Sequence, residues 1–338
     1  MQSFSVAWYE LPLRTPFPAG GEMVRVRRGA IVRVEEDGRS GYGEMAPLAG
    51  LHRESLQDAL EGLQEAVSSG SMPMAPSASF ALSCAQATLV HDRRFGFGRS
   101  EQSGIGVNAV FAGDAAAALA AIERGEFAGY RTVKVKVGMG KVADDAALIG
   151  AMLDGLDPSV RLRLDGNRRL TMTAAVRMMK RLDADRIEYM EEPLRNPLEL
   201  PELSRRTGIV MAIDESLHER EHREALVGAP GVEVQVIKPS LLGALEEVEH
   251  AVTRGRIHGM DTVLSSCLES SYTLAMLARL ASVTSTGGRD HGLASAGLFE
   301  FDVVEQAPVH EGRMEIAPSL PVPKLEFVPL KEAVVPWT

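Results

Sequence analysis

Five short charged segments recur through the middle of the chain at intervals typical of a strand followed by a helix. They are VKVKVG at 133–138, RLDGN at 163–167, YMEEP at 189–193, AIDES at 212–216 and VIKP at 236–239. The steps from Lys136 to Asp165, Glu191, Asp214 and Lys238 are 29, 26, 23 and 24 residues. One strand and one crossover helix occupy about this length. This regular spacing therefore predicts a parallel βα repeat that carries charged groups at its strand ends.

The repeat is long enough to close into a barrel. From residue 107 onward, short β-branched runs alternate with longer amphipathic runs, which predicts a parallel sheet with helices between its strands. About seven such units follow the first strand, and so many units in series favour a closed barrel over an open sheet. A TIM-type barrel needs roughly 200–250 residues. We therefore predict an α/β fold, a modified TIM barrel of the (β/α)7β type, over residues 106–310 of the 338.

The first hundred residues follow a different pattern and predict a separate α+β capping domain over residues 1–105. Strands are expected at 3–10, 23–35 and 40–46 from their alternation, and helices at 52–67 and 78–92 from their apolar spacing. The Gly- and Ser-rich stretch 93–106 forms the expected boundary. At the other end, the Pro-rich segment 311–338 leaves the βα repeat, and we expect it to pack back on the capping domain.

Composition and charge exclude several classes of function. The sequence contains no run of roughly 18 apolar residues, so no membrane span is predicted. The amino terminus alternates apolar and polar residues, which is typical of a strand rather than a signal peptide. The formal charge is −10 and no Lys/Arg-rich run occurs, which argues against nucleic acid or an anionic membrane as partner. Cys84 and Cys267 lie in apolar stretches typical of buried thiols, which fits the cytoplasm. A small-molecule site is expected, with monomer and homo-oligomer both open.

Three acidic residues are the candidate metal ligands. Asp165, Glu191 and Asp214 each fall at the carboxyl end of a predicted strand, where barrel enzymes place their active sites. Carboxylates brought together would repel one another, and a hard divalent cation relieves this repulsion. Because no His or Cys joins the set, Mg²⁺ is expected, with Mn²⁺ possible. Their neighbours Glu192 and Glu215 should alternate to the opposite face of each strand.

Each acid, taken alone, also has a structural interpretation. Asp165 could form a turn with Gly166 and Asn167, and Asp214 or Ser216 could cap the following helix. Three such residues at the ends of consecutive strands favour the metal site over these separate roles.

Lysines are the candidate catalytic groups. Lys134 and Lys136 share one face of a strand, so both should point into the barrel, although a K-x-K pair alone is more typical of a solvated edge strand. Lys238 ends the strand counted as the sixth, and Lys136 lies on the second, so the two should face each other across the metal. This pattern suits a carbon acid: the metal binds a carboxylate and a lysine takes the α-proton. Burial and nearby cations would favour the neutral, basic form of that lysine.

With these residues, the chain resembles the enolase superfamily, and within it the muconate-lactonizing-enzyme subgroup. The matching positions are the K-x-K of the second strand, the Asp/Glu/Asp ligand set and the lysine of the sixth strand. The resemblance covers nearly the whole chain, since the first hundred residues look like the capping domain of the subgroup. It implies that Lys136 and Lys238 are catalytic, with Lys134 beside them.

Several stretches are similar to the o-succinylbenzoate synthase family. They are GYGEMAPLAGL at 41–51, PSASFALSCA at 76–85, IKPSLLGAL at 237–245 and LSSCLESSYTLAMLARLA at 264–281. The resemblance implies loss of water from 2-succinyl-6-hydroxy-2,4-cyclohexadiene-1-carboxylate to give 2-succinylbenzoate, a menaquinone precursor. Lys136 would remove the proton beside the carboxylate. Lys238 would stay protonated on the other side of the ring.

Four further residues are candidates for substrate binding. Asn167 lies two residues past the first ligand, and Ser265 and Ser266 end the expected seventh strand, unless these serines cap the helix that begins near Glu269. Loops near Arg14–Gly21 and Leu48–Leu51 should close over the succinyl chain. Arg14 is the candidate partner for the terminal carboxylate of that chain.

The same catalytic set leaves isomerases open. N-succinylamino acid racemization is the main alternative, because its substrate also carries a succinyl group. Dipeptide epimerization is less favoured, because the stretch 288–302 lacks the Asp-x-Asp pair usual in that family. Muconate cycloisomerization fits the cap and strand-seven segments less well. A barrel kept as a binding or scaffold protein would be expected to have lost at least one of the five key side chains, and all five are present.

Overall fold

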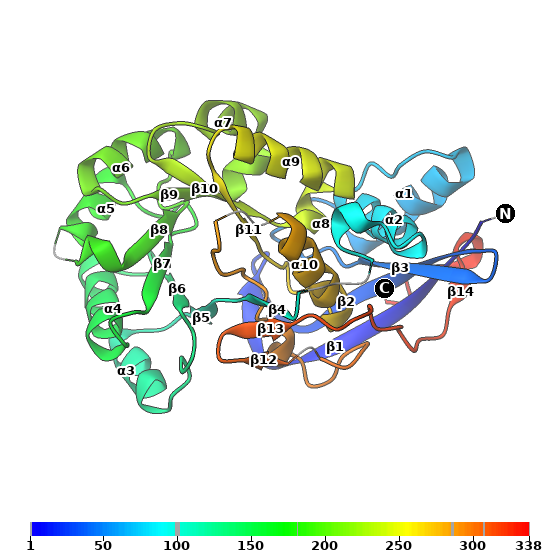
Figure 1. The fold of residues 1–338 in the computed structure, drawn as a ribbon, viewed down its shortest axis with the longest axis horizontal. Helices are drawn as coiled ribbons and strands as arrows, with labels where there is room; N and C mark the ends of the chain where they lie inside the picture. Colours follow the sequence, from blue (N-terminus) through cyan, green and yellow to red (C-terminus); the bar gives the residue numbers. More distant parts are fainter. Residues whose placement is uncertain (1, 99–101, 181, 285–286, 307, 338) are drawn as a thin grey trace.

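The computed structural model describes residues 2–98, 102–180, 182–284, 287–306 and 308–337. One half of the molecule is an antiparallel sheet with two helices, and the other half is a curved parallel sheet surrounded by helices (Figure 1). The antiparallel sheet has the order β14-β1-β2-β3. Its strands are β1 (Ser3–Ala19), β2 (Glu22–Glu36), β3 (Arg39–Met45) and β14 (Val328–Pro329).

Two helices cover one face of this sheet. Helix α1 (Leu56–Ser69) begins at a capping box made by Ser55 and Asp58, which explains why it starts later than residue 52. Helix α2 (Pro76–Leu89) packs directly on β3, because glycines there leave room for its backbone. A Cβ on Gly41 or Gly43 would lie only 2.0 Å from a carbonyl oxygen of α2. The two expected helices of the first hundred residues are therefore confirmed, with shifted ends.

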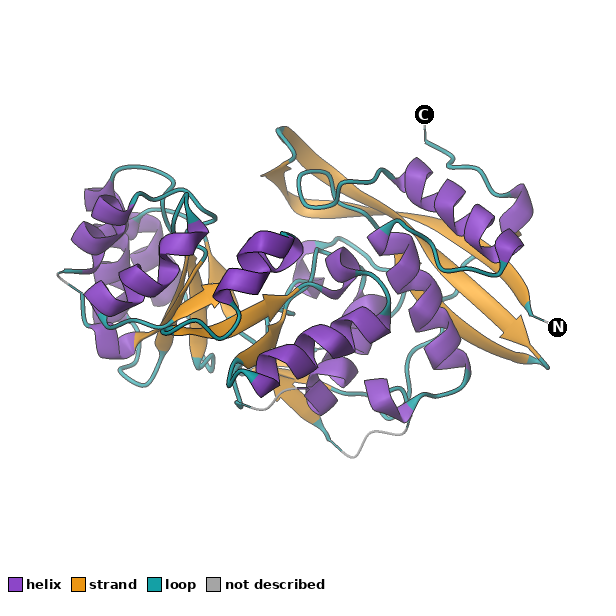
Figure 2. Ribbon diagram, turned by 90° about the horizontal axis from the view of Figure 1, so that it is seen from above, coloured by secondary structure: helices purple, strands orange, loops and turns teal. Residues whose placement is uncertain are grey.

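The second sheet is parallel and has the order β11-β10-β9-β8-β7-β6-β5. Its strands are β5 (Ala109–Phe111), β6 (Thr132–Lys136), β7 (Arg161–Asp165), β8 (Ile187–Glu191), β9 (Met211–Ile213), β10 (Val232–Ile237) and β11 (Asp261–Leu264). The helices between and after them are α3 (Ala115–Glu123), α4 (Val142–Gly155), α5 (Met172–Met179), α6 (Leu200–Thr207), α7 (Arg220–Leu226), α8 (Pro239–Leu242), α9 (Leu245–Ile257) and α10 (Ser271–Thr284). The longer of these helices surround the curved sheet (Figure 2), whereas the short α8 packs against α2 of the capping half.

Residues 291 and 292 close the curved sheet. Val107 bridges to His291, and Ser265 bridges to Gly292, in both cases in parallel. His291 N donates to Gly106 O at 2.8 Å, and Gly292 N donates to Leu264 O at 2.8 Å. This short segment therefore takes the place of an eighth strand between β11 and β5, as the predicted (β/α)7β barrel requires.

The carboxyl-terminal part contacts both halves of the molecule. Strands β12 (Val309–His310) and β13 (Arg313–Glu315) form a small antiparallel sheet with β4 (Gly104–Gly106). Further along, β14 pairs with β1. The domain limits 1–105, 106–310 and 311–338 stay predictions, and residues 99–101 of the expected boundary lie outside the described residues.

Both cysteines are free and buried, as predicted. Among the described residues, no helix is long and apolar enough to cross a membrane.

Candidate active site

The predicted charged residues meet at the carboxyl end of the parallel sheet. Lys136 ends β6, Asp165 ends β7 and Glu191 ends β8, and these three residues are direct register partners on adjacent strands. Asp214 and Lys238 each follow the last residue of their strand. Because parallel strands end at one edge, the five side chains point into one site.

Lys134 joins two of the carboxylates. Its Nζ lies 2.8 Å from both Glu191 Oε1 and Glu191 Oε2, and 2.8 Å from Asp165 Oδ2. Burial would lower the pKa of Lys134, but the charges of Asp165 and Glu191 outweigh it and raise that pKa well above its usual value. Lys134 is therefore held as an ammonium, which suits an electrostatic role rather than that of a base.

The same charges act on the two acids in opposite ways. Burial would raise the pKa of Asp165, but Lys134 and Lys136 outweigh it and hold it well below its usual range. Burial, together with the charges of Asp165 and Asp214, raises the pKa of Glu191 to about 7 despite the nearby Lys134. Glu191 is thus the carboxylate that gains most from another cation close by.

Lys136 is the most accessible of the three lysines. Its side chain is 33% exposed, against 13% for Lys134 and 12% for Lys238. Lys136 Nζ donates to Asp165 Oδ2 at 2.6 Å and to Asn167 Oδ1 at 2.9 Å. Asn167 has a positive φ of 41°, which turns its amide back toward the lysine although β7 has already ended. An accessible amine fixed at this point can reach a substrate.

On the other side, Lys238 Nζ pairs with Asp214 Oδ2. Burial would lower the pKa of Lys238, but Asp214 and Glu191 outweigh it and raise that pKa. Lys238 is therefore protonated. Lys136 and Lys238 belong to β6 and β10, which are separated by three strands in the sheet, and their opposed roles stay a prediction.

The donor set fits a divalent cation. Asp165, Glu191 and Asp214 supply only carboxylate oxygens, and each side chain is 1% exposed. Asp214 Oδ1 is buried and makes no hydrogen bond with any described residue, so it can accept one more contact. Within the described ranges, no three His, Cys, Asp or Glu side chains are already grouped as a metal site. The side chains of Lys134, Lys136 and Lys238 contact these carboxylates, so a bound cation would compete with them.

Sequence reasoning missed a buried hydrogen-bond network, centred on Glu192, that contacts the backbone of Asp214. Glu192 is fully buried, and its Oε1 accepts hydrogen bonds from Asp214 N at 3.1 Å and Ser216 N at 2.7 Å. Arg168 Nε donates to Glu192 Oε2 at 3.1 Å, and its Nη2 donates to Ser216 Oγ at 3.0 Å. Glu192 lies just past the end of β8 and has a positive φ of 38°, so strand alternation does not decide its direction. Its hydrogen bonds fix the chain that carries Asp214.

The prediction that Glu215 faces away from the site is wrong. Glu215 lines the same cavity as Asp214 and Lys238, and its Oε1 accepts from Asn167 Nδ2 at 3.1 Å. Strand alternation fails here because β9 ends at Ile213 and residues 215–218 form a 3-10 turn. The only sequence signal for this change was the adjacent candidate cap Ser216.

The serine and arginine candidates make hydrogen bonds with the closing segment and with residues 295 and 300. Ser265 Oγ contacts Gly292 O at 3.4 Å, and Ser266 Oγ lies 2.9 Å from Ser295 Oγ. Neither caps α10, which begins only at Ser271. Arg14 belongs to the long strand β1 rather than to a loop, and its Nη2 donates to Glu300 O at 3.4 Å.

A cavity of about 440 Å³ opens from Asp214 and Lys238 toward the capping half. Its remaining walls are Gly50, Leu51, His52, Arg53, Glu54 and Pro76 from the capping half, and Glu215, His218, Glu219, Arg223, Leu241 and Leu242 from the barrel. The part of the loop Leu48–Leu51 that was expected to close over the substrate therefore does border this cavity.

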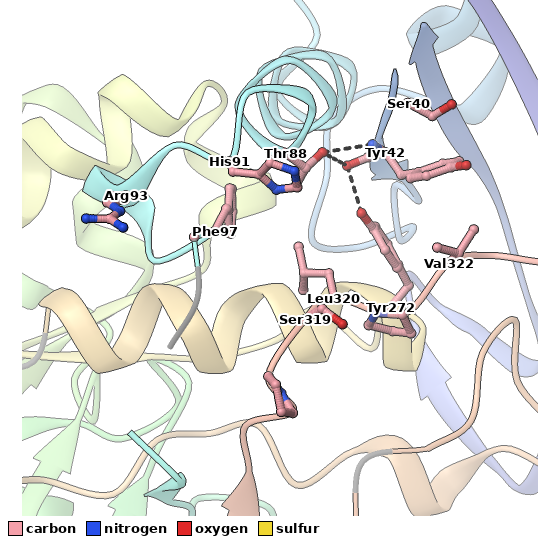
Figure 3. A pocket seen from close by; sticks show the side chains of 13 residues that line it. Ser40, Tyr42, Thr88, His91, Arg93, Phe97, Tyr272, Ser319, Leu320 and Val322 are labelled. Carbon is pink, nitrogen blue, oxygen red and sulfur yellow. Dashed lines mark hydrogen bonds between the residues drawn. The ribbon is translucent and has the colours of Figure 1, made fainter. Parts of the chain in front are cut away.

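A second, larger cleft lies away from these residues. It has a volume of about 580 Å³ and lies among β3, the end of α2, α10 and residues 318–322 (Figure 3). Hydrogen bonds join Thr88, Tyr42 and Tyr272 along its wall. None of the predicted catalytic or metal-binding residues lines this cleft.

Two family models match the chain. The description "Enolase C-terminal domain-like" matches residues 114–321, and "MenC, N-terminal domain" matches residues 1–89. The chain is 33% identical to o-succinylbenzoate synthase from Vibrio cholerae over 97% of this chain and 96% of that protein. It is also 33% identical to o-succinylbenzoate synthase from Klebsiella pneumoniae, over 83% of this chain and 87% of that protein.

Solved structures share the fold at lower identity. The L-Ala-D/L-Glu epimerase from Bacillus subtilis superposes with a TM-score of 0.80 at 18% identity, covering 93% of this chain and 95% of the epimerase. A dipeptide epimerase from Enterococcus faecalis, solved with Mg and a dipeptide, gives a TM-score of 0.80 at 22% identity, covering 94% and 97%. The family models and the relatives at 33% identity place the chain in the enolase superfamily, with its carboxylates and lysines at the ends of the barrel strands: it belongs to the o-succinylbenzoate synthase family of enzymes.

Proposed function

We propose that the chain removes water from 2-succinyl-6-hydroxy-2,4-cyclohexadiene-1-carboxylate to give 2-succinylbenzoate, a precursor of menaquinone. One observation supports this above all: Lys136 and Lys238 flank three buried carboxylates at the barrel mouth. The relatives that cover most of the chain carry the name of this activity.

The chemistry assigns a different role to each lysine. The neutral amine of Lys136 takes the proton from C1, and the electron pair of the C–H bond moves into the ring carboxylate to form an enediolate. As that pair returns, the C6–O bond breaks, and the proton held on Lys136 joins the leaving hydroxide to form water. The ring becomes aromatic, and Lys136 is neutral again.

The other residues hold the reacting groups in place. Lys238 keeps its proton and stabilises the negative charge of the enediolate from the opposite side. Asn167 fixes Lys136 Nζ through the 2.9 Å hydrogen bond of its Oδ1. Lys134 stays an ammonium between Asp165 and Glu191 and adds positive charge near the carboxylate.

We infer that Asp165, Glu191 and Asp214 hold Mg²⁺, with Mn²⁺ as the alternative. When bound, the cation supplies positive charge to the ring carboxylate and so makes the C1 proton more acidic. All-oxygen ligation supports this choice of metal.

A second activity, racemization of N-succinylamino acids, is supported by the opposed positions of Lys136 and Lys238. A racemase needs each lysine to exchange a proton, whereas the dehydration needs only one to do so. The test is to incubate the protein and Mg²⁺ with the cyclohexadiene and follow the aromatic product by ultraviolet absorbance, while N-succinylamino acids are assayed for exchange in D₂O. Fast exchange without dehydration would reverse the assignment.

A further inference from the structure

The cavity that opens from Lys238 contains a cationic group that the proposed chemistry does not use. Arg53 lies in the capping half, just after the loop Leu48–Leu51, and it borders the cavity. Among the described residues it makes no hydrogen bond or ion pair. An arginine without a partner at a cavity wall is a ready site for an anion.

Each acid around the cavity has at least one partner, while Asp214 Oδ1 and Glu215 Oε2 make no hydrogen bond within the described residues. Glu219 pairs with Arg168, and Asp214 pairs with Lys238. Glu54 accepts from Ser77 N at 2.9 Å. Glu215 accepts from Asn167. These contacts leave Arg53 without a carboxylate of its own.

A second arginine strengthens the positive charge at this end. Arg223 on α7 borders the cavity, and its Nη1 donates to Leu217 O at 2.7 Å. Its other two nitrogens are not used in this hydrogen bond. Burial lowers the pKa of His218 to about 4, and Lys238, Arg223 and Arg53 act in the same direction. Glu219 opposes this effect. The Nε2 of His218 is buried and has no hydrogen-bond partner among the described residues.

The remaining walls suit a short hydrocarbon chain. Leu51 and Pro76 come from the capping half, and Leu241 and Leu242 come from the barrel. A ligand whose ring carboxylate lies beside Lys238 would run between these apolar side chains before it reached the arginines. The volume of about 440 Å³ is within the range of small-molecule sites.

We propose that Arg53, assisted by Arg223, binds the terminal carboxylate of the succinyl chain. This inference rests on the proposed function, and it moves that role from Arg14, which does not border the cavity, to the capping residue that does. The site would select substrates that carry two carboxylates separated by a ring and a short chain.

The test compares two ligands on the Mg²⁺-loaded protein by calorimetry. One is 2-succinylbenzoate, and the other is 2-butanoylbenzoate, in which a methyl group replaces the terminal carboxylate. Arg53→Gln should weaken binding of the first by about 10-fold, as expected for loss of a charged hydrogen bond, and should change the second by less than about twofold. Arg256→Gln, at an exposed position on α9, is the matched control.

Two results would overturn the role of Arg53. One is that Arg53→Gln weakens binding of both ligands equally, or of neither. The other is that Arg14→Gln, rather than Arg53→Gln, selectively weakens binding of 2-succinylbenzoate. A parallel dehydration assay of the unchanged protein isolates the proposed function. If the unchanged protein dehydrates the cyclohexadiene while Arg53→Gln fails to discriminate, the inference fails alone.

Discussion

At the scale of single residues, Lys136 is the side chain whose loss should be most specific. It is the accessible lysine, and it contacts Asp165 and Asn167 without supplying a metal ligand. Lys136→Ala should therefore lower kcat by roughly 100- to 10,000-fold, the range of general-base catalysis, and leave metal binding in place. Dehydration assays and Mn²⁺ titration followed by electron paramagnetic resonance would measure both. Lys324→Ala, exposed in the carboxyl-terminal segment, is the control, and retained turnover in Lys136→Ala would assign the base elsewhere.

Glu192 should affect metal binding without touching the metal. Its carboxylate holds the backbone of Asp214 and Ser216, so Glu192→Gln, which turns one oxygen into a donor, removes an acceptor there. We expect Mn²⁺ affinity to fall by about 10- to 100-fold, as is usual when an outer partner of a ligand is lost. Glu199→Gln, at an exposed position, should have no effect. Unchanged Mn²⁺ affinity in Glu192→Gln would show that metal binding by Asp214 does not depend on the hydrogen bonds of Glu192.

At the scale of elements, His291 in the short closing segment should make the stability of the folded chain sensitive to acid. Burial, with the positive charge of Arg163, lowers the pKa of His291 from 6.5 to about 4, and its Nδ1 accepts from Leu264 N at 3.0 Å. The unfolded chain therefore binds more protons than the folded chain between these two values, so stability falls as the pH drops from 6.5 toward 4. The full loss from this residue is about 3 kcal/mol, since one pKa unit corresponds to about 1.4 kcal/mol.

Urea unfolding at a series of pH values measures this loss. His291→Asn keeps an acceptor near Leu264 N and removes the titrating ring, so its stability should fall less steeply over the same pH window. An equal slope in the variant would assign the acid sensitivity to other groups, such as His52 and His218, whose pKa values are also lowered.

At the scale of the whole molecule, Glu44 ties the capping sheet to the barrel. It lies on β3, and its carboxylate accepts from Ser270 N at 2.9 Å, from Ser270 Oγ and from Tyr9 OH. Glu44→Ala would leave these buried donors unpaired and should cost about 2–4 kcal/mol of unfolding free energy. The urea midpoint measures it, with exposed Glu22→Ala as control. A loss below about 1 kcal/mol would mean that the two halves do not depend on this contact.

Much of this architecture could be predicted from the sequence. The strand-end positions of Lys136, Asp165 and Glu191 follow from the repeat length, because each βα unit returns the chain to the same edge. The position of Glu215 could not be predicted, because alternation holds only while the strand continues. Arg53 was equally hidden, because its place in the wall of the cavity that Lys238 also lines depends on how the capping half meets the barrel.

Closure of the parallel sheet by residues 291 and 292 makes that seam the weakest line around the barrel. Elsewhere β6 and β7 are joined over five register pairs, whereas each side of the seam has a single bridge. Thermal opening should therefore begin there, and the amide protons of His291 and Gly292 should exchange with solvent before those of β7. Ser265 lies on one side of this seam. Ser265, one of the predicted substrate contacts, therefore lies in the part of the barrel wall that should open first on heating.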